Sequence, residues 1–307
     1  MSDSLPEVTI LAGPTAVGKT EVAVALARAS NAEIISADSR QVYRELDIGT
    51  AKPSPEQRAA VPHHLVDFLD PRERYNAERF ALDALRVVGE LTAQGRRALV
   101  VGGTGFYLEA LMQELSDIPP PDPDIEARLE CEAAESGSAA LHRRLAEVDA
   151  ETAARLQPAD RQRVLRALAV WETSGRPLSH FHRASPRRER VRVRRYVVLT
   201  RPREELYRRI DRRVDAMVQA GLAEEVRALA ERYGWEASGL DALGYRQFRE
   251  HLTGNRSLAQ SVELLRRDTR RYAKRQLTWF RRVSPAVWVD LSDPAVGSIS
   301  AILDAGV

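Results

Sequence analysis

The chain has 307 residues, 44% of them hydrophobic, and carries 46 Lys and Arg against 44 Asp and Glu, a net charge of +2; this length predicts one or two domains. No apolar run approaches the ~20 residues of a membrane span, the N-terminal residues lack a signal-peptide pattern, and Cys131, the lone cysteine, excludes an internal disulfide or a multi-cysteine metal site. We therefore expect a cytoplasmic protein without a membrane partner.

The first part of the chain alternates short apolar runs with helical patterns. An apolar run at 8–13 precedes a helical pattern at 20–29, and a second run follows at 32–38. Residues 96–112 repeat the arrangement as a basic lead-in, an apolar run, a glycine turn and a helical pattern. Strands that alternate with helices predict a parallel sheet wrapped by helices.

The middle of the chain changes character. Four prolines at 119–123 predict a linker. The pattern is then helical from 124 to about 182, without a convincing strand, and 192–200 again predicts a strand. We therefore predict an α/β core interrupted by an all-helical insertion. The predicted domains are 1–117 together with 191–307 for the core, and 118–190 for the insertion.

The remaining chain is helical and rich in arginine. Helical patterns cover 203–221, 222–233 and about 261–282. Arginine is concentrated after Arg187, whereas the earlier chain has a more even balance of charges. Local basic density favours polyanion binding, but arginine helices paired with nearby acids and solvated by water explain the same pattern.

A phosphate-binding motif stands at the first predicted strand end. The residues GPTAVGKT, 13–20, match G-x-x-x-x-G-K-[ST] with a strand before and a helix after, a context typical of nucleotide-binding proteins. The glycines allow backbone N–H groups to face a phosphate, while Lys19 supplies charge and Thr20 a hydroxyl ligand for Mg²⁺. The fold class is therefore an α/β P-loop core with a parallel sheet flanked by helices.

Two further turns are candidates for the same site. Asp38 ends the second predicted strand, and the carboxyl ends of parallel strands face the ligand crevice. As an anion at neutral pH it suits a metal ligand or a proton acceptor, although a helix N-cap explains it too. The turn GGTGFY at 102–107, with Thr104 at its centre, suits either an anion at a helix N-terminus or tight packing.

Six segments together resemble one family. GPTAVGKT, ISADSRQVYRELDIGTAKP, PHHLVD, VGGTGFYLEAL, LGYRQF and YAKRQLTWFRR occur in the order and context of the bacterial tRNA dimethylallyltransferases, over nearly the whole chain. The resemblance implies transfer of a dimethylallyl group from dimethylallyl diphosphate to N6 of the adenosine 3′ of the anticodon. It implies Mg²⁺ as cofactor, the tRNA anticodon stem-loop as partner, and a monomer.

The resemblance also assigns roles to residues. It makes Asp38 the general base and places Thr104 near the reacting centre. Arg227 is expected to reach the diphosphate, although an ion pair with Glu224 is an equal alternative. The implied diphosphate site is Gly13, Pro14, Thr15, Ala16, Val17, Gly18, Lys19, Thr20 and Arg227. The implied tRNA contacts are Asp38, Ser39, Arg40, Gln41, Arg128, Gln162, Arg163, Val164, Leu165, Arg166, Gly244, Tyr245, Arg246, Gln247, Lys274, Arg275 and Gln276.

Other residues have less specific interpretations. His63 and His64 lack ligands at metal spacing, so we favour structural hydrogen bonds. Tyr43 suits the core or a contact, and Trp279 and Phe280 are expected in the core rather than stacked on bases. Compared with the family pattern, Arg40 replaces a frequently apolar residue and Glu109 a frequent lysine.

Two other functions remain open from the sequence. An ATP-dependent P-loop kinase for a small molecule or nucleoside would share the loop and the fold. A non-catalytic RNA-binding regulator with a relic loop is the third reading, against which the presence of Lys19, Thr20 and Asp38 argues.

Overall fold

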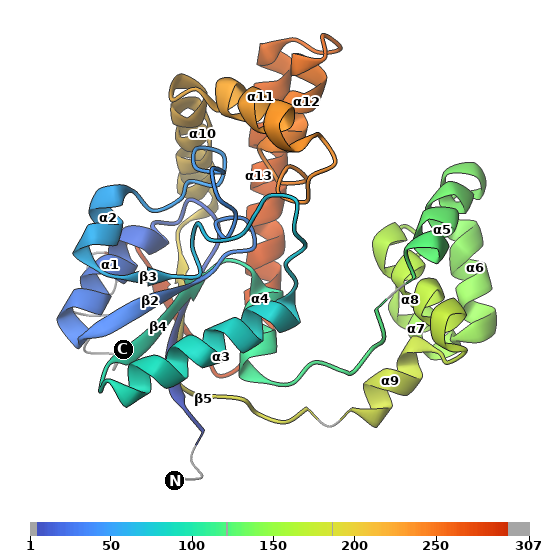
Figure 1. The fold of residues 1–307 in the computed structure, drawn as a ribbon, viewed down its shortest axis with the longest axis horizontal. Coiled ribbons are helices and arrows are strands. Elements are labelled where there is room, and N and C mark those ends of the chain that lie inside the picture. The colour runs from blue at the N-terminus through green and yellow to red at the C-terminus, as the bar shows by residue number, and fades with distance from the viewer. Residues whose placement is uncertain (1–4, 121, 186, 294–307) are drawn as a thin grey trace. The chain divides into compact units, whose positions relative to one another are not determined.

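The computed structural model describes residues 5–120, 122–185 and 187–293, and its chain divides into two units (Figure 1). The first unit combines Met1–Gln113 with Glu189–Val307, and the second is Glu114–Arg188. None of the helices in the described part of the chain combines the length and apolar composition that crossing a bilayer requires.

The first unit is built on a six-stranded sheet whose neighbouring strands all pair in parallel. The predicted parallel sheet and its four strands are thus confirmed, whereas β3 and β6, which are short, were not predicted. The spatial order is β3-β2-β4-β1-β5-β6. The strands are β1 Glu7–Ala12, β2 Ala32–Ala37, β3 His63–His64, β4 Arg97–Gly102, β5 Arg192–Thr200 and β6 Val287–Asp290.

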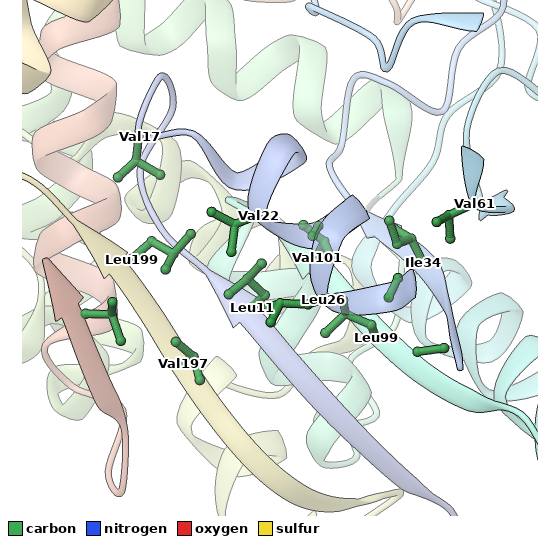
Figure 2. Packing of buried hydrophobic residues seen from close by; sticks show 14 of the residues in the cluster. Leu11, Val17, Val22, Leu26, Ile34, Val61, Leu99, Val101, Val197 and Leu199 are labelled. Carbon is green, nitrogen blue, oxygen red and sulfur yellow. The ribbon is translucent and has the colours of Figure 1, made fainter. Parts of the chain in front are cut away.

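One core cluster joins the sheet to helices. Leu11 of β1, Leu199 of β5 and Leu26 of α1 are fully buried and pack in the same cluster (Figure 2). Burial of each such side chain stabilises the fold by about 1.5–3 kcal/mol. This cluster fixes the segment between β1 and α1 against β5. The helices nearest the sheet in sequence are α1 Lys19–Ser30, α2 Pro55–Ala60, α3 Ala77–Ala93 and α4 Gly105–Met112.

A second cluster in the same unit anchors the segment that follows β2. Leu46 and Leu69 pack there with Tyr245, Phe248 and Leu265, all of them buried. The long helix α13, Leu258–Phe280, follows its N-cap Ser257, whose side chain forms a capping box with Gln260. The helices that contribute are α10 Arg203–Gln219, α11 Leu222–Tyr233, α12 Tyr245–Leu252 and α13 Leu258–Phe280.

The regular elements in the described residues of the second unit are all helices, as the sequence predicts. Its own core includes Leu129, Leu141, Leu145 and Leu168. Its first helix begins at Pro123, inside the predicted linker, because proline is well suited to the first helical position, where its missing N–H is not needed. The helices are α5 Pro123–Ser136, α6 Ser138–Val148, α7 Ala150–Arg155, α8 Arg161–Ser174 and α9 Leu178–Ala184.

Candidate active site at the carboxyl edge of the sheet

The phosphate-binding motif forms the turn between β1 and α1. A side chain at Gly13 would place its Cβ 2.8 Å from the carbonyl oxygen of Leu199, and Gly18 has a φ of 111°. Both positions therefore require glycine. Lys19 Nζ donates to the carbonyl oxygens of Gly13 and Pro14, each at 2.9 Å, so its ammonium lies within the curve of the loop.

The charge of Lys19 depends on its surroundings. Burial lowers the pKa of Lys19 to about 8, the negative charge of Asp38 opposes that shift, and the positive charge of Arg213 adds to it. Asp38 and Arg213 thus lie close enough to act on the loop. The Lys19 side chain stays mostly protonated at neutral pH because its pKa still lies above 7.

Asp38 directly follows β2 and holds a turn. Its Oδ1 accepts hydrogen bonds from the backbone N–H groups of Arg40, at 2.9 Å, and Gln41, at 3.3 Å. The helix N-cap alternative is wrong, since no helix begins here and the carboxylate instead closes a turn. Both bonds use one oxygen, which leaves Oδ2 to interact with a substrate.

Thr104 lies beside Asp38, at the N-terminus of α4. Its Oγ1 accepts from the Ser39 N–H at 3.2 Å, and its own N–H donates to the carbonyl oxygen of Ala37 at 3.3 Å. The phenol of Tyr272 lies near the Thr104 side chain, and burial raises the pKa of Tyr272 to about 12, which keeps this phenol neutral. A Cβ at Gly102 would lie 2.1 Å from the Ala37 oxygen, so glycine permits the two turns to approach this closely.

Three arginines lie beside the loop, one directly after β5 and two on α10, and none of them was among the predicted site residues. Arg201 Nε donates to the Val17 carbonyl at 2.9 Å, and Arg209 Nε donates to the Ala16 carbonyl at 2.8 Å. Burial lowers the pKa of Arg213, which the charge of Asp38 opposes. Arg201 follows the predicted strand directly, so its strand-end position was a usable signal. The α10 residues stand among many arginines, which concealed them.

Arg227, the arginine predicted to reach the diphosphate, lies on the exposed side of α11. Its helix packs into the cluster around Tyr245 rather than into the cluster around the loop. Within the described ranges it forms no ion pair with Glu224, so the alternative interpretation gains no support. Its contact with a diphosphate stays a prediction.

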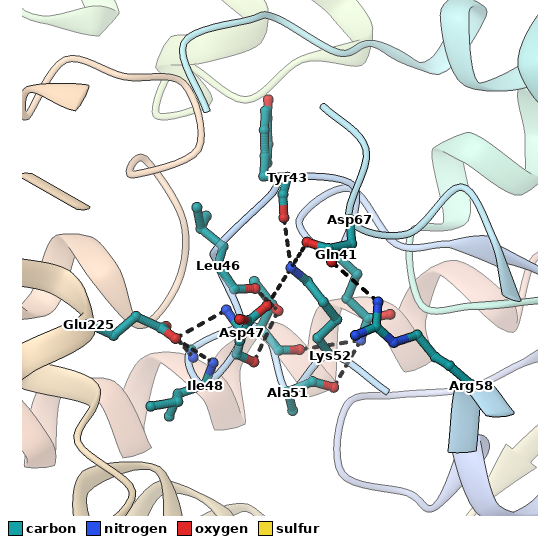
Figure 3. A network of polar contacts seen from close by, with 12 residues as sticks. Gln41, Tyr43, Leu46, Asp47, Ile48, Ala51, Lys52, Arg58, Asp67 and Glu225 are labelled. Carbon is teal, nitrogen blue, oxygen red and sulfur yellow. Dashed lines mark hydrogen bonds and ion pairs between the residues drawn. The ribbon is translucent and has the colours of Figure 1, made fainter. Parts of the chain in front are cut away.

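A polar network folds the segment after Asp38, whose sequence was the most specific part of the resemblance (Figure 3). Lys52 Nζ contacts Asp47 Oδ1 at 2.5 Å, Asp67 Oδ1 at 2.7 Å and the Tyr43 carbonyl at 2.9 Å. The side chain of Lys52 is only 3% exposed, and its buried charge is paired with two carboxylates that reach the surface. The network explains why this segment holds one shape beside the site.

Glu225 of α11 completes the network by accepting from three successive backbone N–H groups. They belong to Asp47, Ile48 and Gly49, at 3.1, 2.8 and 3.0 Å. Tyr245 Oη donates to the same carboxylate at 2.7 Å, and the nearby negative charge adds to burial in raising the pKa of Tyr245 well above its ordinary value. Glu225 is therefore the side chain that holds the backbone of residues 47–49 in place.

Replacing Glu225 by glutamine is expected to lower the free energy of unfolding by about 2 kcal/mol, because charged hydrogen bonds to backbone donors are lost. Glu224→Gln is the matched control, since it removes the same charge from the same helical turn and its side chain is exposed. We expect that control to change stability by no more than about 0.5 kcal/mol. Urea unfolding of both variants is the measurement. Equal losses would mean that the helix dipole, and not the loop, accounts for the effect.

Several residues predicted to contact tRNA are buried, or have a side chain that is hydrogen-bonded within the protein. Tyr245 is fully buried, and Gln247, 5% exposed, accepts from the Gly244 N–H at 2.9 Å and donates to Asp268 Oδ2 at 3.1 Å. Gln41 accepts from Ser36 Oγ and donates to the Thr50 and Ala51 carbonyls. Val164 and Leu165 are buried in the helical unit. These side chains support the shape of their surroundings.

The exposed members of the predicted tRNA set are cations and one amide. In the first unit they are Arg246, Lys274 and Arg275, and Arg40 is half-buried, with its guanidinium donating to the Ser238 carbonyl at 3.1 Å. In the second unit Gln162 and Arg163 are exposed, Arg128 pairs with Glu172, and Arg166 donates to the Pro119 carbonyl at 3.2 Å.

Gln276 has a different place from Lys274 and Arg275, its neighbours on α13. Its Oε1 accepts from the Thr15 N–H at 2.9 Å, and its Nε2 donates to the Gly103 carbonyl at 2.9 Å. The residue is 5% exposed. Both ends of the amide are therefore satisfied by backbone groups of the two glycine turns.

The two histidines form structural hydrogen bonds, as predicted. His63 Nδ1 contacts the Val61 carbonyl at 2.8 Å, and His64 Nε2 contacts Glu33 Oε2 at 2.5 Å. Among the residues that the structure describes, no group of three or more His, Cys, Asp and Glu suits a metal ion. Tyr43 and Phe280 are buried, and Trp279 packs against Phe106 with ring centroids 6.4 Å apart.

Comparison with protein families gives two matches. The family model described as IPP transferase matches residues 41–283, and the model described as isopentenyl transferase matches residues 6–64. The two matches together span both glycine turns and the segment between β2 and β3.

Individual relatives agree with these matches. A tRNA dimethylallyltransferase of Syntrophobacter fumaroxidans is 50% identical over 287 residues, which cover 93% of this chain and 84% of the relative. One from Roseiflexus sp. is 44% identical and covers 98% of this chain and 100% of the relative.

Solved structures also match over nearly the whole chain. The tRNA isopentenylpyrophosphate transferase of Bacillus halodurans has a TM-score of 0.72 at 38% identity, covering 98% of this chain and 95% of its own. A eukaryotic dimethylallyltransferase acting on tRNA has a TM-score of 0.80 at 26% identity, covering 97% of this chain and 77% of its own.

Proposed function

The chain belongs to the IPP transferase family, and from that premise we propose how its site acts on tRNA. It transfers a dimethylallyl group to N6 of the adenosine on the 3′ side of the anticodon, with dimethylallyl diphosphate as the proposed donor. The observation that carries the mechanism is the convergence of Lys19, Asp38 and Thr104 at one edge of the sheet. All three come from one chain, so we propose that a monomer suffices.

The donor side of the proposed site stabilises the leaving group. As the allylic C–O bond breaks, the diphosphate takes the electron pair and gains negative charge at the oxygen that was bonded to the allylic carbon. The loop N–H groups, Lys19 and the nearby Arg213 are fixed positive groups that favour this charge. Thr104 offers a hydroxyl on the side of the loop that faces Asp38.

Mg²⁺ fits the same side of the site. The Thr20 hydroxyl, in the first turn of α1, is a hard oxygen donor next to Lys19, and Mg²⁺ commonly binds through few protein oxygens together with phosphate oxygens and water. When bound, the ion would neutralise charge on the leaving diphosphate. We propose Thr20 as its protein ligand.

The acceptor side of the proposed site activates the amine. The N6 lone pair of adenine is delocalised into the ring, so the amine is a poor nucleophile. As the new C–N bond forms, Asp38 Oδ2 accepts the proton that N6 loses, which is general base catalysis. The other carboxylate oxygen keeps the turn closed through Arg40 and Gln41.

We propose that the exposed cations bind the anticodon stem-loop. Arg246, Lys274 and Arg275 in the first unit, and Arg163 in the second, are positioned on surfaces rather than in cores. Phosphate contacts of this kind make affinity fall steeply with salt. The target base must leave its stack to reach Asp38, at a cost of a few kcal/mol.

Mass analysis of anticodon-loop nucleosides after incubation with unmodified tRNA and labelled dimethylallyl diphosphate tests the proposal. The expected product is N6-(dimethylallyl)adenosine at one position, with the label retained. A parallel reaction with labelled ATP examines the kinase alternative. Transfer of label from ATP, without prenylated nucleoside, would overturn the proposed function.

The pH dependence of donor capture is expected to follow Lys19. Its pKa of about 8 means that the ammonium is charged below that pH and neutral above it, so kcat/KM for the donor should fall about tenfold per pH unit above pH 8. Lys19→Arg keeps its charge throughout and should lose this alkaline decline, at a lower plateau. An unchanged profile in that variant would show that another group titrates.

A further inference from the structure

The structure joins the two glycine turns of the site through one side chain. Gln276 bonds to the Thr15 N–H in the phosphate-binding loop and to the Gly103 carbonyl immediately before Thr104, each at 2.9 Å. A Cβ at Gly103 would lie 2.2 Å from Gln276 Nε2. The glycine and the amide are therefore fitted to each other.

A second contact comes from the same face of α13. Tyr272 precedes Gln276 by four residues, and side chains at this spacing lie on one side of a helix. The phenol of Tyr272 lies near the side chain of Thr104. One face of α13 thus contacts the donor loop, the second glycine turn and Thr104 itself, whereas Lys274 and Arg275 point to solvent.

We propose that Gln276 is a positioning residue that sets the distance between the donor loop and Thr104. The inference rests on the proposed function, in which the loop holds the diphosphate and Thr104 faces the breaking C–O bond. The two bonds of the amide have opposite polarity, because one end accepts and the other donates. An amide therefore fits both turns, whereas a carboxylate would place an oxygen against the Gly103 carbonyl and a thioether would leave both groups unpaired.

This role differs from an RNA contact, for which Gln276 was a candidate from the sequence. A residue that contacts tRNA changes tRNA affinity, and a cationic one also changes the salt dependence of that affinity. A residue that aligns the reacting groups changes the rate of prenylation within the bound complex. A misplacement of about 1 Å can lower that rate about 10²-fold. The two roles are therefore separable by measurement.

The experiment measures single-turnover prenylation with saturating tRNA and donor, together with the tRNA Kd at several salt concentrations. Gln276→Met is expected to lower the single-turnover rate of prenylation about 10- to 100-fold, with the tRNA Kd and its salt slope unchanged. Lys274 lies two residues before Gln276, on the exposed side of α13. Lys274→Met is expected to weaken tRNA binding and reduce the salt slope. Gln219→Met, on an exposed position of α10, is the matched control and should behave like the wild type.

A double-mutant cycle separates alignment from general loss of structure. In a Thr104→Ala background the hydroxyl to be aligned is gone, so Gln276→Met should cost much less than in the wild type. If thermal unfolding shows that Gln276→Met does not fold, Gln276→Glu, which keeps the acceptor for Thr15, enters the same cycle. Equal costs in both backgrounds, or weakened tRNA binding at an unchanged rate, would overturn the inference. An inactive wild-type protein would instead count against the proposed function.

Discussion

Replacing Asp38 by asparagine is expected to slow prenylation of bound tRNA by about 10²- to 10⁴-fold, the usual contribution of a general base. Asparagine keeps an oxygen that accepts from the Arg40 and Gln41 N–H groups, so the turn should persist. Its NH₂ group cannot take the proton from N6. Single-turnover rates, with the tRNA Kd measured in parallel, are the readout, and we expect the Kd to stay at the wild-type value.

The same variant offers an independent check through Lys19. The negative charge of Asp38 raises the pKa of Lys19 against the effect of burial, so its removal should shift the alkaline decline in donor kcat/KM to lower pH. Asp215→Asn, an aspartate on α10 that pairs with Arg266, is the control and should retain the wild-type rate and profile. Full activity of Asp38→Asn would rule out this carboxylate as the base.

Replacing Lys19 by methionine is the second large effect, with an expected loss of about 10²- to 10³-fold in kcat. Methionine keeps much of the side-chain volume but supplies no charge to the leaving diphosphate and no donor to the Gly13 and Pro14 carbonyls. Arg209 and Arg201 bond to loop carbonyls rather than replacing the ammonium, so neither is expected to compensate.

Donor and tRNA kinetics distinguish Lys19 from the other lysines of the chain, Lys52 and Lys274. Lys52→Met removes the buried cation that pairs with Asp47 and Asp67 and should lower thermal stability first. Lys274→Met should act on tRNA affinity. If Lys19→Met raised the KM for tRNA and left the donor parameters intact, the assignment of the loop to the donor would be wrong.

The parallel sheet and the phosphate-binding loop were predictable because their signals are local. A buried strand followed by a glycine turn and a helix fixes both fold and function within about twenty residues, as at 8–29. Asp38 and Thr104 were predictable as neighbours because both follow strands of one sheet. The resemblance added their roles.

The contacts between distant segments could not be predicted from patterns. Gln276, Tyr245 and Gln247 stand in motifs that suggested RNA binding, yet the structure uses their polar groups within the core. Arg213 approaches Asp38 from α10, where one arginine of many faces inward. Which member of a repeated residue type turns toward a site depends on tertiary packing, and helical periodicity alone left several candidates.

The close approach of Gly102 to the Ala37 carbonyl has a consequence for how such enzymes diversify. The spacing between Asp38 and the Thr104 hydroxyl is set by main-chain atoms of the adjacent strands β2 and β4, where even a methyl group has no room. A substitution that alters specificity is therefore expected to lie away from this main-chain contact. The reactive centre can be inherited unchanged while its specificity drifts.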